Sequence, residues 1–143
     1  MVNPFKVALA DNRLSDRGVA AIVDGLRGCG QLDELDLSKN VVAGRATAAF
    51  VRAIAEPAVR ATLRTLSLEK CHLSGRAMAS LAEAFMAGDE PAALHKLNLA
   101  RNAVDADCAV QGRKRVIQRR FNLSVPRARV SETAPTLRER SER

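Results

Sequence analysis

The sequence predicts an α/β solenoid of about 3.5 to 4 repeats, in which short parallel strands alternate with helices. Three observations predict it: a segment of eleven residues recurs along the chain, each copy contains the apolar alternation of a strand, and apolar residues at helical spacing follow each copy. A fixed period of roughly 20 to 50 residues is typical of solenoids, because a single repeat buries its apolar side only against its neighbours.

The repeated segment follows the pattern L-x-x-L-x-L-x-x-[N/C]-x-[L/V]. It fits three stretches without a gap, namely residues 32–42, 63–73 and 94–104. A further copy at residues 4–14 fits from its second apolar position onward, with Pro4 in place of the first leucine. The second apolar position recurs at spacings of 28, 31 and 31 residues and is held by Val7, Leu35, Leu66 and Leu97. We therefore expect the last three residues to lie on adjacent parallel strands.

A small polar residue follows each strand at a fixed position, and we interpret it as a structural ladder residue without a functional role. Backbone groups at this point have left the strand and need new hydrogen-bond partners. A buried side-chain amide, aligned with its counterparts in neighbouring repeats, can supply them. The ladder position is held by Asn12, Asn40, Cys71 and Asn102.

After each strand, apolar residues recur every three or four positions, which indicates a helix with one apolar face. The pattern predicts helices near residues 16–27, 44–56 and 75–87. Gly28 and Gly88 are the expected C-terminal stops of two of them. We expect Pro57 and Pro91 in loops, because proline cannot continue a helix.

These repeats resemble the ribonuclease-inhibitor-like class of leucine-rich repeats, which alternates Asn and Cys at the ladder position and pairs each strand with a full helix. The resemblance covers about residues 4–112. It implies a right-handed, curved stack, with parallel strands on the concave face, helices on the convex face, and partner proteins bound by exposed strand positions of the concave face. Two of the three spacings, at 31 residues, are longer than the usual repeat of this class, so we expect an expanded loop at residues 56–62.

The chain has room for about one domain, and its charge divides it in two. Residues 1–110 carry 13 basic and 13 acidic side chains, whereas residues 111–143 carry 10 basic and 3 acidic ones. The whole formal charge of +7 therefore belongs to the end of the chain. We divide the protein into a leucine-rich repeat domain at residues 1–112 and a basic tail at residues 113–143, which we expect to be helical at most to residue 121 and disordered beyond it.

Neither end of the repeat array has an evident polar cap, although solenoids normally need one. Gly112 and Arg113 interrupt the apolar pattern of the last repeat. Three explanations remain open. The tail folds back as a helix over residues 106–121, with Val116, Ile117 and Phe121 on one side; the ends pack on a neighbouring chain; or the chain is a fragment of a longer array.

The first function hypothesis is a non-enzymatic protein–protein interaction module, or scaffold, that binds its partner through the concave face. Strand alternation turns every second residue outward, and the resulting surface is polar and mixed in sign, which suits a protein partner. The chain contains no Trp or Tyr, the residues that most often dominate binding energy. The candidate contact residues are Lys6, Glu34, Asp36, Lys39, Thr65, Ser67, Glu69, Lys70, Lys96, Asn98 and Arg101.

The alternative hypothesis is a nucleic-acid-binding or ribonucleoprotein-associated subunit that is anchored by its tail. Basic side chains there can neutralise phosphates in a salt-sensitive manner. Only Phe121 in this tail could stack on a base. A basic run is more often a solvated tail, a nuclear-import signal or a contact to an anionic surface. The candidate anion contacts are Arg113, Lys114, Arg115, Arg119, Arg120, Arg127 and Arg129.

Several other classes of function find no support in the sequence. His72 and His95 have no recurrent carboxylate or nucleophile beside them, and no phosphate-loop or H-E-x-x-H motif is present. Cys29, Cys71 and Cys108 lack paired spacing, so we expect reduced thiols and neither a metal nor a cofactor. No apolar stretch approaches the roughly 18 residues of a membrane span, and no secretory signal is visible. We expect an intracellular protein, cytoplasmic by default, with the nucleus as the alternative.

Overall fold

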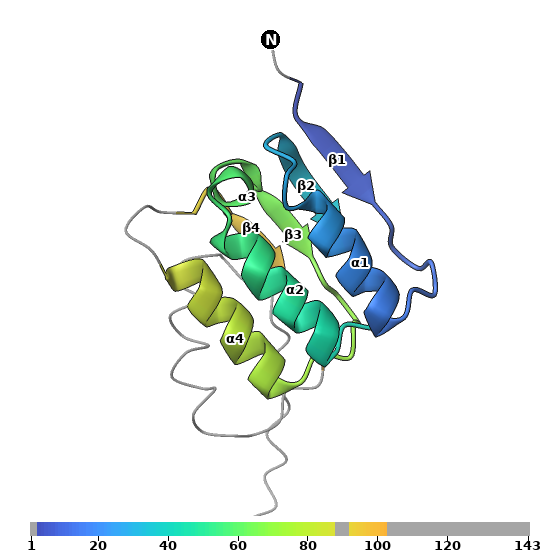
Figure 1. The fold of residues 1–143 in the computed structure, drawn as a ribbon. Coiled ribbons are helices and arrows are strands. Elements are labelled where there is room, and N and C mark those ends of the chain that lie inside the picture. Colours follow the sequence, from blue (N-terminus) through green and yellow to red (C-terminus); the bar gives the residue numbers. More distant parts are fainter. Residues whose placement is uncertain (1–2, 88–91, 103–143) are drawn as a thin grey trace, which may run out of the picture.

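A computed structural model describes residues 3–87 and 92–102 of the chain. Strands and helices alternate along it, with one additional short helix between the second and third strands (Figure 1). In chain order the elements are β1 (Phe5–Ala8), α1 (Asp16–Leu26), β2 (Leu32–Asp36), α2 (Gly44–Ala55), α3 (Pro57–Thr62), β3 (Thr65–Ser67), α4 (Gly75–Met86) and β4 (Lys96–Asn98).

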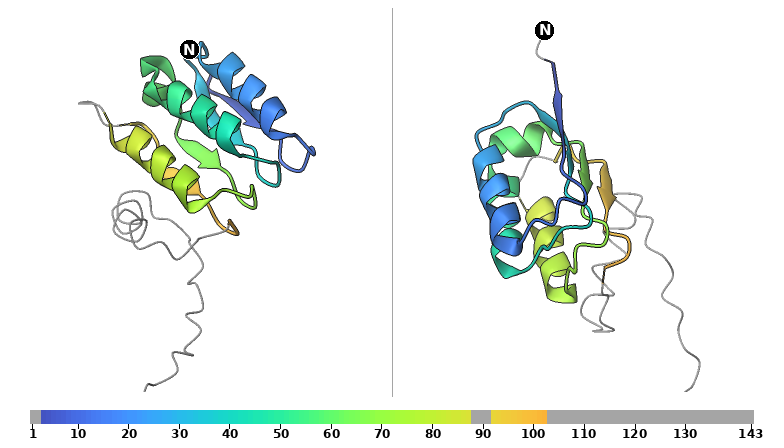
Figure 2. Two further views of the ribbon diagram at one scale, coloured as in Figure 1. Left: turned by 60° about the horizontal axis from the view of Figure 1, so that its bottom comes forward. Right: turned by 90° about the vertical axis from the view of Figure 1, so that its right-hand side faces the viewer.

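The four described strands form one parallel sheet in the order β1-β2-β3-β4. Leu35 pairs with Leu66 in register, and Leu66 pairs with Leu97. The described helices all lie on one side of this sheet (Figure 2). The predicted α/β class is therefore confirmed, and so is the placement of the three repeat leucines on adjacent parallel strands.

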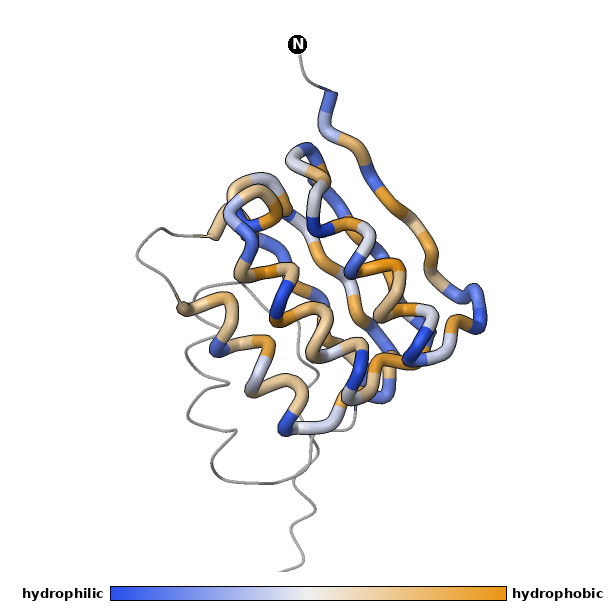
Figure 3. The backbone as a smooth tube through the Cα atoms, viewed as in Figure 1, coloured by the Kyte–Doolittle hydropathy of each residue, from blue (hydrophilic) through white to orange (hydrophobic). Residues whose placement is uncertain are grey.

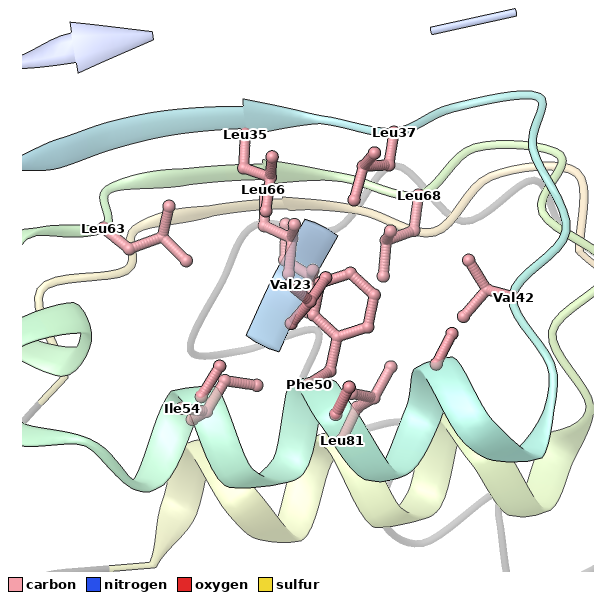
Figure 4. Packing of buried hydrophobic residues seen from close by; sticks show 14 of the residues in the cluster. Val23, Leu35, Leu37, Val42, Phe50, Ile54, Leu63, Leu66, Leu68 and Leu81 are labelled. Atoms are coloured by element: carbon pink, nitrogen blue, oxygen red, sulfur yellow. The ribbon is translucent and has the colours of Figure 1, made fainter. Parts of the chain in front are cut away.

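One apolar core lies between the sheet and the helices. Leucines of β2 and β3 and of the residues that follow them point toward Val23, Phe50, Ile54 and Leu81 on the helices (Figure 4). Leu66 and Leu68 have no exposed surface at all. Hydrophobic positions alternate with hydrophilic ones along the strands and the long helices (Figure 3), and the buried ones from each repeat belong to one shared core.

The three long helices begin at the residues that the sequence predicts and end one residue earlier than expected. Ser15 and Ser74 cap α1 and α4, where their hydroxyls accept hydrogen bonds of 3.2 Å from the amides of Gly18 and Ala77. The residue before α2 is Ala43, which has no side chain able to cap. Its cap comes from Asp16 on α1, which binds the first amides of α2.

The expected loop at residues 56–62 is wrong, because most of it folds as α3. Pro57 stands at the start of this helix, where the missing amide hydrogen would have no helical partner in any case. Val59 is buried against the core. Arg60 donates hydrogen bonds of 3.1 and 3.2 Å to the carbonyls of Ala84 and Phe85 near the end of α4, so the added segment also caps a neighbouring helix.

The turn after each strand repeats as closely as the strand itself. In all four repeats, the residue directly before the ladder position has a φ between 54° and 59°, in the left-handed region that side chains other than glycine seldom adopt. These residues are Asp11, Lys39, Lys70 and Arg101. The sequence pattern leaves this position variable. The backbone conformation nevertheless recurs there, so the repeat is also visible in the structure, independently of the residues that define the pattern.

The ladder residues Asn40, Cys71 and Asn102 bind backbone groups of their own and the preceding repeat. The Asn40 amide donates hydrogen bonds to the carbonyls of Leu9 and Leu37 at 2.9 and 3.0 Å, and its oxygen accepts one from the Leu14 amide. Asn102 makes the same kinds of contact one pair of repeats later. The Cys71 thiol donates to the Leu37 carbonyl of the preceding repeat. Asn12, in the first repeat, bonds only to the nearby Ala10 carbonyl.

Several predictions concern residues outside the described ranges. They include the last helix at residues 106–121, the boundary between domain and tail at residue 112, Gly88, Pro91 and Cys108. Among the described residues, no helix has the length and apolar character required to cross a membrane.

Candidate interaction surface

The side of the sheet opposite the helices forms the candidate interaction surface, which we call the open face (Figure 2). Strand residues that alternate with the buried leucines lie on this face. They form rows across the sheet, because the strands pair in register. The first row is Lys6, Glu34, Thr65 and Lys96, and the second is Ala8, Asp36, Ser67 and Asn98.

Parallel hydrogen bonding continues beyond the strands and adds two further rows. The amide of Asp11 donates to the carbonyl of Ser38 at 2.9 Å, that of Lys39 to Glu69 at 2.8 Å, and that of Lys70 to Ala100 at 3.0 Å. A third row therefore contains Ala10, Ser38, Glu69 and Ala100, and a fourth contains Asp11, Lys39, Lys70 and Arg101. We call the fourth row the turn row. The structure brings all eleven predicted contact residues together on these rows.

Cross-strand contacts neutralise part of the charge on the open face. Lys6 forms an ion pair with Glu34 at 2.7 Å, and hydrogen bonding to this carboxylate, followed by its charge, raises the pKa of Lys6. Glu69 lies 3.5 Å from the Arg101 guanidinium and accepts a hydrogen bond of 3.2 Å from Asn98. Of the four acidic groups in these rows, Glu34 and Glu69 are therefore already paired within the described part of the chain.

Other polar side chains on the face serve the backbone or one another. Asp36 accepts a hydrogen bond of 3.0 Å from the Ser38 amide, and Asn98 accepts one of 3.1 Å from the Ala100 amide. Both bonds span two residues and fix the chain where it leaves the strand. The hydroxyls of Ser38 and Ser67 lie 2.8 Å apart and share a hydrogen bond. The centre of the face is thus a fixed polar network.

The charge that remains unpaired is mainly basic. Within the described residues, Lys39, Lys70 and Lys96 are exposed and make no ion pair. The sequence indicates only a surface of mixed sign, because it cannot say which acids are engaged by neighbouring strands. Because Glu34 and Glu69 are paired and Asp36 binds the Ser38 amide, the free charges of this surface are these three lysines and Asp11.

The histidines and cysteines of the described residues do not assemble into a site. His72 follows β3 and His95 precedes β4. The two histidines therefore lie at opposite ends of the parallel strands, and both are exposed. Cys71 is a buried free thiol whose pKa is raised by burial, and Cys29 is a half-buried free thiol. In this part of the chain, no group of three His, Cys, Asp or Glu side chains is placed to hold a metal ion.

A groove of about 840 Å³ lies between α2 and α4 on the helix side of the molecule. Small side chains line much of it, including Ala48, Ala77 and Ala84. Thr47 lies on its wall with a buried hydroxyl that has no hydrogen-bond partner among the described residues. No local sequence pattern predicts this groove, because it depends on the separation of two helices.

The chain matches no protein-family model, and no curated protein matches it in a sequence comparison. The predicted anion contacts of the tail, from Arg113 to Arg129, lie outside the described residues. The candidate site therefore consists of the open face and its turn row.

Proposed function

We propose that the protein is a right-handed leucine-rich-repeat solenoid of the ribonuclease-inhibitor-like class and that it acts as a non-enzymatic protein-interaction module. The repeated left-handed turn and the backbone bonds of Asn40 and Asn102 support the repeat class. In this proposal the open face is the concave side of the stack, and a partner protein contacts it.

One observation carries the proposal: four strands present polar side chains in register on a face that none of the described helices covers. A surface of this kind fixes many hydrogen-bonding groups at regular spacing, with neighbouring strands about 4.8 Å apart. The bonds among Ser38, Ser67, Asn98 and Glu69 hold these groups before any partner arrives. Such preorganisation reduces the ordering cost of association.

We propose a non-enzymatic role because of the geometry of the described residues. Activation of a nucleophile requires a base within about 3 Å of it. The two histidines lie at opposite ends of the parallel strands, and the hydroxyls of Ser38 and Ser67 on the open face bond to each other. These features favour recognition over catalysis.

Site-specific photo-crosslinking in the full chain tests the proposal. A photo-reactive residue is placed at Thr65 or Lys96 on the open face, and at Arg17 or Arg76 on exposed helix positions as matched controls. We expect a discrete protein adduct from the open-face positions that persists after nuclease treatment. Equal adducts from the helix positions, or adducts that disappear with nuclease, would contradict the proposal; the second result would favour nucleic-acid binding by the tail.

A further inference from the structure

We propose that the turn row binds an acidic segment of the partner protein, with Lys39 and Lys70 as the principal contacts and Arg101 at the end of the row. This inference rests on the proposed protein-binding function and specifies the chemistry of the partner at that surface.

The three basic residues of the turn row lie on consecutive turns. The backbone bonds from Lys39 to Glu69 and from Lys70 to Ala100 place these lysines on neighbouring turns, with Arg101 on the next. Adjacent positions of such a ladder are about 4.8 Å apart. All three residues have the same left-handed backbone conformation and are exposed. The row therefore presents three cations at even spacing along one edge of the open face.

The positive charge of the turn row is only partly neutralised within the described residues. Lys39 and Lys70 make no ion pair within the described residues, and Arg101 shares Glu69 with Asn98. Like charges on directly neighbouring strand positions destabilise a sheet. A carboxylate between two such lysines removes that repulsion and gains an attraction to both. An acidic ligand is therefore the complement that this row lacks.

The spacing and composition of the turn row favour a protein ligand over a polynucleotide. Carboxylates at positions i and i+3 or i+4 of a helix have Cβ atoms about 5–6 Å apart, close to the spacing of the row. Binding of single-stranded nucleic acid commonly adds aromatic side chains on which bases stack. The four rows of the open face contain no aromatic residue. The surface thus fits an acidic helical segment better than a strand of bases.

The row also has a direction. Asp11 occupies its first position beside Lys39, so negative charge stands at the β1 end and positive charge at the β4 end. An acidic segment is repelled from the first position and attracted to the other three. We infer that the segment covers the turns after β2, β3 and β4 and leaves the turn after β1 free.

The test is an NMR titration of the isotope-labelled full chain with a synthetic helical peptide that carries glutamates at positions i and i+4. We expect the largest shifts at the amides of Lys39, Lys70 and Arg101. The double variant Lys39→Glu/Lys70→Glu should weaken peptide binding at this row by about tenfold or more. The neutral variant Lys39→Gln/Lys70→Gln should give an intermediate loss, which separates charge from misfolding.

The matched control is Arg17→Glu/Arg76→Glu, which makes the same change in net charge on exposed helix positions. Binding to the tail is separated by its own amide signals. Shifts confined to the tail, an equal loss in the control variant, or stronger binding of a single-stranded oligonucleotide at the turn row would overturn the inference. If the open-face crosslink of the proposed function persists in the Lys39→Glu/Lys70→Glu variant, the acidic segment alone is wrong; if no crosslink forms in either protein, the proposed function fails.

Discussion

The carboxylate of Asp16 accepts a hydrogen bond of 2.7 Å from the backbone amide of Ala43, so that the first long helix supplies the cap of the second. The same side chain accepts bonds of 3.0 and 3.1 Å from the amides of Ala46 and Arg45. Amides in the first turn of a helix have no partner within it. One carboxylate therefore joins two consecutive repeats on the helix side of the molecule.

Replacement of Asp16 by Ala should lower the free energy of unfolding by about 1–2 kcal/mol, because several amides of α2 lose their only acceptor. Urea unfolding followed by circular dichroism measures this change. Asp24→Ala is the matched control, since Asp24 also lies on α1 and contacts α2, but through an exposed ion pair with Arg52 at 3.1 Å. The control should lose less than about 1 kcal/mol. Equal losses would show that Asp16 acts only as a surface charge.

The stabilisation by Asp16 should depend on pH. Burial, the largest single influence, acts to raise the pKa of this carboxyl, but the amides of Ala46, Ala43 and Arg45 together with the Arg45 charge outweigh it and hold the pKa below its ordinary value. A carboxyl with a lowered pKa in the folded state stabilises the fold above its unfolded pKa and loses this contribution as the pH falls through the folded pKa. The stability difference between the natural protein and Asp16→Asn should therefore be greatest above about pH 5 and shrink at lower pH. A difference that grew on acidification would contradict the assignment.

The two asparagines at the first and second ladder positions should differ strongly in their effect on stability. Asn40 is buried and bonds to backbone groups of two repeats, whereas Asn12 is exposed and makes one local bond of 3.2 Å. Asn40→Ala leaves buried backbone groups unpaired, so we expect a loss of about 2–4 kcal/mol. Asn12→Ala should change stability by less than about 0.5 kcal/mol. Similar losses at the two positions, measured by thermal and urea unfolding, would show that contacts to the preceding repeat contribute little.

The strands and the starts of the helices follow from local sequence patterns, and for this reason the sequence predicts them. The alternation around Leu35, Leu66 and Leu97 predicts the strands, and Ser15 and Ser74 are ordinary N-cap residues at the starts of two helices. Pro57 is ambiguous, since proline both stops a helix and favours its first position. The choice at this residue depends on the burial of Val59 against the core, which is a tertiary contact.

The residues of the open face were likewise predictable, but their pairing was not. Alternation along a strand determines which side chains face away from the core. Whether Glu69 engages Arg101 or Lys70 depends on side-chain geometry across two turns. The cap that Asp16 provides comes from the preceding repeat, 27 residues away from Ala43. The lack of a capping side chain at Ala43 therefore does not reveal which residue accepts the hydrogen bonds. Contacts between repeats are thus what the sequence pattern leaves open.

Replacement of Thr47 by Val should stabilise the protein by about 1 kcal/mol. Thr47 occupies on α2 the position that Val19 and Met78 hold on α1 and α4, and all three are buried. Its hydroxyl has no partner among the described residues, and burial of an unpaired hydroxyl costs about 1–3 kcal/mol. Valine keeps the branched shape, because a methyl group replaces the hydroxyl.

The matched control for this change is Thr62→Val on α3. There the threonine hydroxyl donates a hydrogen bond of 3.0 Å to the Ala58 carbonyl and is partly exposed, so its removal should bring no gain. Urea unfolding of both variants measures the difference. A loss of stability in Thr47→Val would mean that the hydroxyl is satisfied in solution, most simply by water in the groove between α2 and α4 that Thr47 lines. A gain restricted to Thr47 would establish that this position belongs to the apolar core, with the groove above it remaining a surface feature.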